Sequence, residues 1–142
     1  MRGTLRRWCF LACLTLTVGL TAQEGHPLVG SWHGTWTLTG AEPKDLTLII
    51  DYTPDGANIT GLANPGYDHA DLKNLVVEFP KPTDWNVKFE VDLKDRTGKV
   101  THYLADGKLD QIGYDQRTLS GTWMAGATKG NFKLTRDRDY SR

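Results

Sequence analysis

The stretch from residue 84 to residue 94, DWNVKFEVDLK, alternates apolar and polar side chains without interruption. Its apolar positions are Trp85, Val87, Phe89, Val91 and Leu93. Successive side chains of a β-strand point to opposite faces, so this order predicts a strand with one dry face and one wet face.

The same period of two recurs in other short runs that lie between turn signals. These runs place on one face Leu46, Leu48, Ile50 and Tyr52, then Leu75, Val77 and Phe79, and near the end Leu119, Gly121 and Trp123. No window keeps apolar residues at helical spacing long enough to predict a helix. We therefore expect an all-β chain of about eight or nine strands. Strands with one dry face must bury it, which favours an antiparallel up-and-down β-barrel.

Glycine and proline mark the expected connections between these strands. The tightest hairpin signals are Pro54-Asp55-Gly56 and Asp106-Gly107, because Asp-Gly suits the positive φ of a two-residue loop. Longer connections are expected at residues 64–71 and 79–84. Binding residues concentrate on long loops and at the mouths of barrels, so these connections bear on function.

The first 22 residues have the order of a secretory signal peptide. Three arginines, Arg2, Arg6 and Arg7, precede an apolar run over residues 8–20 that is too short to span a bilayer comfortably. Small residues follow, so we expect cleavage after Ala22 and an exported protein, periplasmic or secreted. A twin-arginine address or a lipid on Cys13 are alternatives. The expected organisation is a signal peptide over 1–22, a leader over 23–27, a barrel over 28–138 and a tail over 139–142.

Removal of the signal peptide changes the charge and the cysteine content. The 17 basic residues of the chain become 14 while the 17 acidic residues stay, which gives a net charge of −3. An acidic domain of this kind lacks the electrostatic footprint for nucleic acid. Both cysteines, Cys9 and Cys13, leave with the signal, so the mature chain has no disulfide, no thiolate metal site and no expected membrane span.

A Gly-x-Trp triplet occurs three times, at Gly30-Ser31-Trp32, Gly34-Thr35-Trp36 and Gly121-Thr122-Trp123. Residues two apart share a strand face, so the glycines and the indoles all point inward. Glycine beside an indole makes room for a neighbouring strand or lets the strand coil sharply. We expect Gly30, Trp32 and Arg136 to close one end of the barrel, with Arg136 stacked on Trp32 in a cation–π contact.

With these motifs the chain resembles the lipocalin and calycin pattern of an early Gly-x-Trp, a meander of about eight strands and a late basic residue. The stretches GSWHGTWTL, LTLIIDYTPDG with ITGLANPG, and TLSGTWMAGATKGNFKLTRD resemble more closely the small exported lipocalin-like domain of bacteria. The similarity covers most of the mature chain. The chain departs from the larger lipocalins in being shorter and in lacking a C-terminal helix pattern and a cysteine pair.

Catalytic and metal-binding patterns are sparse. No histidine stands in a metal-ligand spacing, although Asp68, His69 and Asp71 lie within four positions of one loop. The serines lack the Gly-x-Ser-x-Gly elbow of hydrolases, and the AGATKG segment runs into a strand instead of a phosphate-binding helix. We expect no catalytic residues, no metal and no cofactor. An enzyme with a loop site centred on His69 is the less favoured alternative.

The aromatic interior offers the best functional hypothesis. If the strand parity is right, Trp36, Tyr52, Trp85, Phe89 and Trp123 face inward. Either they fill the barrel, or they line a pocket for a small apolar or amphipathic ligand. We expect an exported, non-catalytic binding module with these five residues as its pocket lining. The alternative is a solid-core interaction domain that binds an exported protein partner on the loop around Tyr67, Asp68 and His69.

Overall fold

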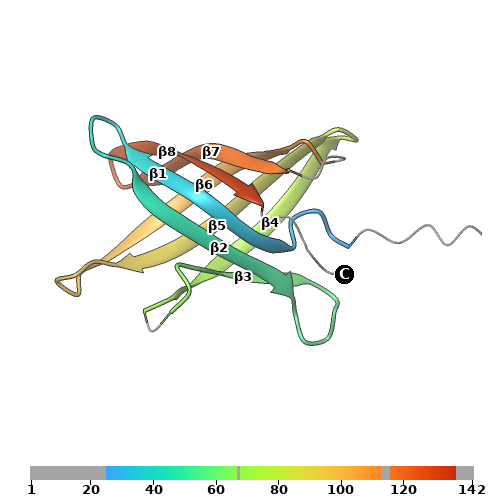
Figure 1. Ribbon diagram of the computed structural model, residues 1–142, viewed down its shortest axis with the longest axis horizontal. Helices are drawn as coiled ribbons and strands as arrows, with labels where there is room; N and C mark the ends of the chain where they lie inside the picture. Colours follow the sequence, from blue (N-terminus) through green and yellow to red (C-terminus); the bar gives the residue numbers. More distant parts are fainter. Residues whose placement is uncertain (1–24, 67, 113–115, 137–142) are drawn as a thin grey trace, which may run out of the picture.

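The computed structural model describes residues 25–66, 68–112 and 116–136, and within them the chain is all-β. Eight strands form a closed antiparallel up-and-down barrel in which each strand pairs with its sequence neighbours (Figure 1). They are β1 Gly30–Leu38, β2 Lys44–Tyr52, β3 Ile59–Ala63, β4 Ala70–Lys81, β5 Asp84–Lys94, β6 Val100–Asp110, β7 Thr118–Ala125 and β8 Thr128–Arg136. The expected fold class is confirmed. No helix in the described ranges is long and apolar enough to cross a membrane.

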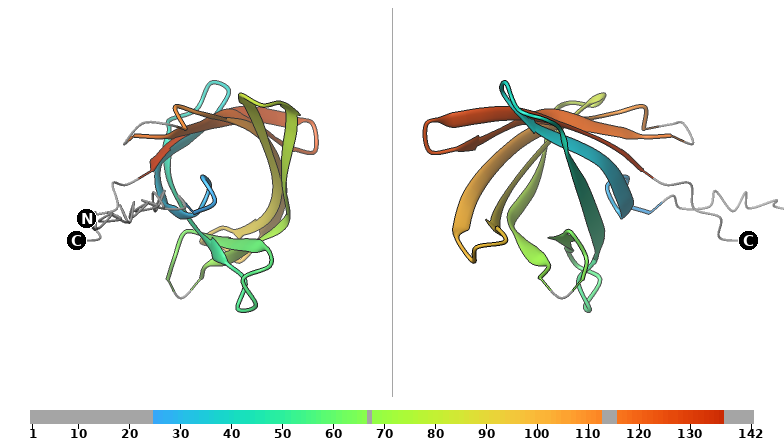
Figure 2. Two further views of the ribbon diagram at one scale, coloured as in Figure 1. Left: turned by 90° about the vertical axis from the view of Figure 1, so that its right-hand side faces the viewer. Right: turned by 60° about the vertical axis from the view of Figure 1, so that its left-hand side comes forward.

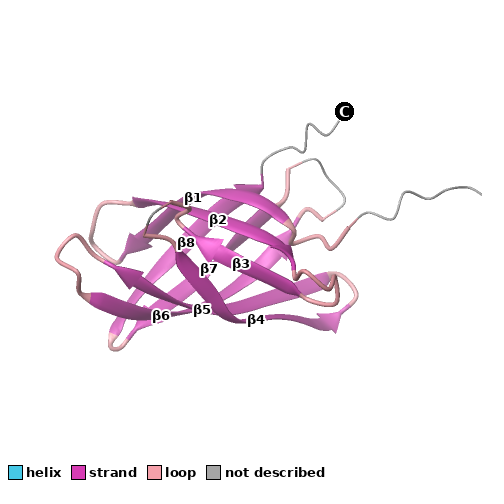
Figure 3. Ribbon diagram, turned by 90° about the horizontal axis from the view of Figure 1, so that it is seen from below, coloured by secondary structure: helices cyan, strands magenta, loops and turns pink. Residues whose placement is uncertain are grey.

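The barrel closes where β1 pairs with β8. The two strands align from Trp32 opposite Arg136 to Leu38 opposite Gly130. Figure 3 shows the strands and their connections, and the described segments contain no helical turn between them. Closure removes the exposed edges that an open sheet of this size would leave.

The predicted parity decides which side chains form the core. Burial alternates along the regular strands, as in β5, where Val87, Phe89 and Val91 are buried between exposed or half-buried polar neighbours. The core also contains Trp32 and Leu48, which are fully buried. Burial of the apolar faces supplies the main driving force for closing the sheet.

A β-bulge in β4 changes the parity within that strand. Asn74 has a φ of 48°, and the register with β5 shifts between Lys73 and Val76. The bulge turns both Leu72 and Leu75 toward the interior although they are three residues apart. The same strand ends with Phe79 53% exposed, although its ring packs edge-on against Trp85 at a centroid distance of 4.3 Å.

The two ends of the barrel differ. The closed end carries the N-terminal plug, residues 25–29, which Figure 2 shows as a blue segment inside the ring of strands. The indole Nε1 of Trp32 donates to the carbonyl oxygen of Leu28 at 2.8 Å. Arg117 donates through Nη1 to Pro27 O at 3.0 Å, and Arg136 through Nη1 to Val29 O at 3.1 Å. The open end lies opposite, at the connections 39–43, 64–69, 95–99 and 126–127.

The glycines of the Gly-x-Trp triplets permit close approach of neighbouring backbones. A Cβ on Gly34 would lie 2.0 Å from the carbonyl oxygen of Lys133, and one on Gly121 would lie 2.1 Å from that of Asp106. The predicted hairpin at Asp106-Gly107 is wrong, because both residues lie inside β6. Gly107 is there for packing: a Cβ would come within 2.8 Å of the Phe132 ring.

Candidate functional site

The candidate site is a pocket of about 350 Å³ at the open end of the barrel. Its floor consists of three aromatic side chains: Trp36 of β1, Tyr103 of β6 and Trp123 of β7. The rings meet edge to face, with centroids 5.0 Å apart for Trp36 and Tyr103 and 5.2 Å apart for each of the other two pairs. This edge-on packing is the favoured geometry for aromatic rings and makes a firm apolar surface.

Strand register brings the three rings together. Trp36 lies opposite Phe132 of β8, and Trp123 lies opposite Gly130 of the same strand. Gly130 makes this possible, since a Cβ there would lie 2.4 Å from the Trp123 ring. The Trp123 indole can therefore lie across β8 toward Trp36.

The walls and the rim of the pocket are mixed in character. Apolar side chains from the strand ends contribute Leu38 and Ala125, while the rim carries Lys44 and Lys99 and one carboxylate, Glu42. The Lys44 Nζ lies 5.6 Å from the centroid of the Trp36 ring, which is a cation–π contact. An apolar floor with a few polar groups at the rim is typical of a small-molecule site.

A second recess of about 870 Å³ adjoins this pocket and shares Trp36, Lys44, Thr101 and Tyr103 with it. It extends over the β3–β4 and β5–β6 connections, and its charged residues of both signs lie there and at the adjacent ends of β2 and β5. Together the two recesses make the open end a broad entrance above one aromatic floor.

Below the floor the barrel interior is filled. The void between the floor and deeper core residues such as Phe89 and Phe132 measures only about 30 Å³. The Phe89 and Phe132 rings pack with their centroids 6.0 Å apart. A ligand at the open end would thus rest on the floor and not enter the barrel.

Two polar groups in the floor affect its chemistry. Burial raises the pKa of the Tyr103 phenol, the Thr101 hydroxyl opposes this by hydrogen bonding, and the charge of Asp95 adds to the rise. The phenol is therefore neutral and able to donate a hydrogen bond at neutral pH. The Trp123 Nε1 is buried, and it has no acceptor among the described residues.

The structure separates the five predicted pocket residues. Trp36 and Trp123 line the pocket, and Phe89 lies in the core with 4% of its surface exposed. Tyr52 and Trp85 are at the closed end and do not line this pocket. Tyr52 is 41% exposed and its hydroxyl accepts a hydrogen bond from the His26 main chain. Parity along a strand tells which face a residue occupies, but its height along the barrel depends on register.

Tyr103 was missed by the sequence analysis. The local pattern is ambiguous, because the exposed apolar residue Leu104 lies between Tyr103 and Ala105 and breaks the alternation of apolar and polar residues. The hairpin expected at Asp106-Gly107 also interrupted this pattern, so the phenol was left outside the predicted site.

The residues expected to close the barrel lie together at the closed end. Trp32 and Arg136 occupy directly paired positions on β1 and β8. Gly30 has a φ of 137°. A Cβ added to Gly30 would lie 3.0 Å from the Cδ atom of Arg136. Within the described part of the chain Arg136 makes no cation–π contact with Trp32. Its guanidinium donates to the carbonyl oxygen of Val29 instead.

The loop that carries His69 has no catalytic geometry. The His69 Nε2 is 3.9 Å from the nearest Asp71 carboxylate oxygen, beyond hydrogen-bonding distance, and its Nδ1 lies 3.0 Å from Gly66 O. Tyr67 lies outside the described residues. Within the described ranges no three His, Cys, Asp or Glu side chains are grouped so as to hold a metal ion.

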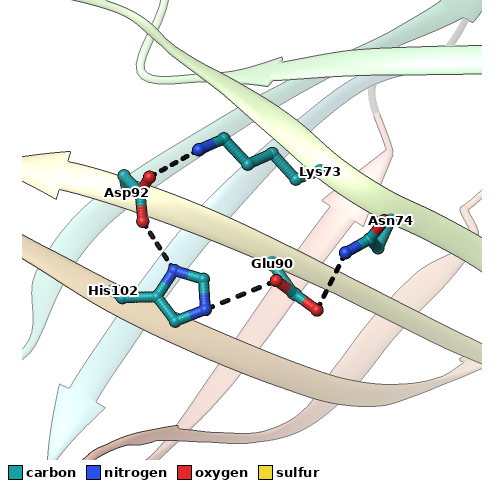
Figure 4. A network of polar contacts seen from close by, with 5 residues as sticks. All are labelled: Lys73, Asn74, Glu90, Asp92 and His102. Atoms are coloured by element: carbon teal, nitrogen blue, oxygen red, sulfur yellow. Dashed lines mark hydrogen bonds and ion pairs between the residues drawn. The ribbon is translucent and has the colours of Figure 1, made fainter.

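A polar network on the outer wall involves β4, β5 and β6 (Figure 4). His102 stands between two carboxylates, with Nδ1 2.6 Å from Asp92 Oδ1 and Nε2 3.4 Å from Glu90 Oε2. Asp92 also accepts from the Lys73 Nζ at 2.6 Å, and Asn74 donates to Glu90 at 3.0 Å. The network ties the bulged part of β4 to β5. Because the two carboxylates lie on opposite sides of the imidazole, it offers no common ligand position.

Comparison with models of known protein families and with curated proteins gives no match for this chain.

Proposed function

We propose that this protein is a non-catalytic binding module that takes a small apolar or amphipathic molecule at the open end of its barrel. The observation that carries the proposal is the three-ring floor of Trp36, Tyr103 and Trp123 beneath a pocket of about 350 Å³. Pockets of this volume and composition suit a ligand of drug-like size. A flat ligand would bury the exposed ring surfaces and gain free energy in proportion to the apolar area covered.

The closed end of the barrel also favours entry of a ligand from the open end. The plug of residues 25–29 fills that end and is fixed by Arg117 and Arg136, so a ligand would approach from the open end only. In line with the N-terminal sequence, we propose that the protein is exported and that it is a member of the small lipocalin-like group. Mass spectrometry of the product secreted by a bacterial host tests export, and an N-terminus near residue 23 is the expected result.

Intrinsic tryptophan fluorescence tests the binding function. Two of the indoles form the floor, so a ligand from a panel of aromatic and amphipathic compounds should change the emission in a saturable way. An Ala125→Phe variant fills the pocket wall and should abolish the change. The matched variant Met124→Phe alters the neighbouring residue, which is 40% exposed on the outer face, and should bind as the parent does. A folded protein whose emission no compound alters would contradict the proposal.

A second candidate follows from the filled interior. The 30 Å³ void leaves no room for a ligand inside the barrel, as expected of a solid-core interaction domain. This candidate predicts a flat response to every compound together with an intact cooperative unfolding transition. Saturable binding that Ala125→Phe removes would exclude it as the main function of the open end.

A further inference from the structure

The charged side chains above the aromatic floor are not evenly distributed. Lys44 lies opposite Trp36 in the β1–β2 register, on the inner face of β2 beyond Leu46. Lys99 immediately precedes β6, two residues before Thr101, which also lines the pocket. Both lysines thus extend inward-facing rows of strand residues to the rim.

Neither of these ammonium groups forms a close ion pair with a described carboxylate, although the charge of Lys99 adds to the Thr97 hydrogen bond in lowering the pKa of Asp95. Within the described part of the chain no carboxylate oxygen lies within 4.0 Å of Lys44 or Lys99, whereas Lys73, Lys88 and Lys108 on the outer wall all have carboxylate partners. Lysines that remain unpaired beside an apolar surface are available to a ligand. Their aliphatic stems can cover the apolar wall while the ammonium groups reach the ligand.

The 350 Å³ pocket itself has more basic than acidic lining residues, while the adjoining recess is lined by Asp45, Asp68 and Asp95. Asp95 accepts hydrogen bonds from Thr97 N at 2.8 Å, Thr97 Oγ1 at 2.6 Å and Lys99 N at 3.0 Å, so its carboxylate is used inside the β5–β6 turn. Glu42 is the one carboxylate that lines the pocket, and it comes from the β1–β2 connection. The lining therefore carries two cations and one anion.

The floor also contains an unused donor. The Trp123 Nε1 is buried with no acceptor in the described ranges, which is a rare and unfavourable state for an indole N–H. Because this atom is buried and the ring edge beside it lies over Gly130, a ligand in the pocket does not reach it. The charge excess of the pocket lining is therefore that of Lys44 and Lys99 at the rim.

We infer that the ligand of this pocket is a small amphipathic carboxylate whose apolar body rests on Trp36, Tyr103 and Trp123 and whose anionic group is held by Lys44 and Lys99. This inference rests on the proposed binding function and specifies the chemical class of its ligand. A charge-assisted contact with two ammonium groups beside an apolar surface is stronger than its fully solvated counterpart.

The test is a calorimetric titration of the whole chain with three compounds that share one ring system: 2-naphthoate, 2-naphthamide and 2-naphthylmethylammonium. We expect the carboxylate to bind about tenfold more tightly than the amide at low salt, because its charge is the only added interaction. The ammonium compound should bind most weakly. The preference for the carboxylate should shrink as the salt concentration rises.

Substitutions test whether Lys44 and Lys99 cause the preference for the carboxylate over the amide. Lys44→Gln and Lys99→Gln should each lower the carboxylate-to-amide ratio several-fold, and Lys44→Arg should keep it. Lys133→Gln changes the net charge equally on the exposed outer face of β8 and should leave the ratio unchanged. All three positions are exposed, so urea midpoints should confirm that the four variants fold.

The outcomes separate the inference from the function on which it rests. Equal binding of carboxylate and amide, or tightest binding of the ammonium compound, would overturn the anionic class while the binding function stands. A ratio that Lys133→Gln lowers as much as Lys44→Gln would overturn the assignment to the rim. If none of the three compounds binds, the inference fails, and a response to the wider fluorescence panel then decides whether the binding function fails with it.

Discussion

The indole N–H of Trp32 is hydrogen-bonded to the carbonyl oxygen of Leu28, and both side chains are completely buried. The bond joins the N-terminal plug to the first strand at a point where no water can replace it. An unpaired buried carbonyl costs free energy, so this contact fixes the plug in the closed end. The open end is then the side of the barrel left for binding.

Replacement of Trp32 by Phe should destabilise the protein by about 2–4 kcal/mol, because it removes this hydrogen bond and leaves a cavity in the core. Urea denaturation measures the change. Trp36→Phe is the control, since that indole is half-buried and makes no hydrogen bond within the described residues. Equal losses for the two variants would show that the bond to Leu28 contributes nothing.

Addition of one methyl group at three inward glycines should give a graded loss of stability. Gly121→Ala should cost about 3 kcal/mol or prevent folding, because the new Cβ meets the Asp106 carbonyl oxygen at 2.1 Å. Gly34→Ala should behave similarly. Gly107→Ala should cost less, since the nearest atom belongs to the Phe132 ring and side chains can shift. Thermal unfolding ranks the variants, and a Gly107 variant less stable than the Gly121 variant would contradict the ranking.

Acid should loosen the plug through His26. Partial burial lowers the pKa of His26 below its usual 6.5, and its Nδ1 accepts a hydrogen bond from Leu28 N at 3.2 Å. Because the unfolded chain binds the proton more readily, the contribution of neutral His26 is complete above pH 6.5. It is lost as the pH falls from 6.5 toward the lower pKa of the folded state.

NMR titration gives the His26 pKa directly, and urea midpoints between pH 8 and pH 5 give its effect on stability. His26→Gln should flatten the fall in midpoint that the parent shows over this range. His33→Gln, at an exposed position on the outer face of β1, should keep it. A His26 that titrates at or above 6.5 would contradict the prediction.

The outer network should stabilise the protein only while Asp92 is ionised. Hydrogen bonds from Lys73 and then from His102 lower the pKa of Asp92, and the bond to Asp92 raises that of Lys73. The contribution of Asp92 is thus present above the unfolded pKa of 3.8 and is lost as the pH falls through the lower folded value. That of Lys73 is present below 10.5 and is lost as the pH rises through its higher folded value.

Asp92→Asn should therefore lower the urea midpoint at pH 7 by a small amount, and this effect should shrink as the pH falls below 3.8 through the lower folded pKa. The effect at pH 7 should diminish in 1 M salt, because these groups are exposed to solvent. A Lys73→Gln, Asp92→Asn double-mutant cycle at pH 7 isolates the pair. A difference at pH 2 as large as that at pH 7 would mean that Asp92 acts through packing and not through its charge.

Much of the fold could be predicted from local sequence patterns. Alternation such as that around Val87 and Phe89 specifies strands and their buried faces, because the period of two is a property of each strand alone. The absence of a helical period then leaves a closed sheet as the way to bury those faces. The same reasoning assigned Trp36 and Trp123 to the inner face, where the structure has them.

The hairpin signal at Asp106-Gly107 failed because glycine also serves close packing between strands. Whether it faces a turn or the Phe132 ring depends on a neighbour 25 residues away in the chain, which local sequence cannot show. The bulge at Asn74 also could not be predicted from local sequence, because an asparagine with positive φ has no unique sequence signature.

The sequence by itself determined the all-β class, the dry faces of the regular strands and the aromatic character of the interior, since these follow from the alternation of residues within each segment. Tertiary structure decided how high along the barrel each aromatic side chain lies. Register and closure placed Tyr52 and Trp85 at the plugged end, buried Phe89, and joined Tyr103 to Trp36 and Trp123 beneath the lysines of the open end. Height along a barrel is set by pairing between strands distant in sequence, so it is fixed only when the sheet closes.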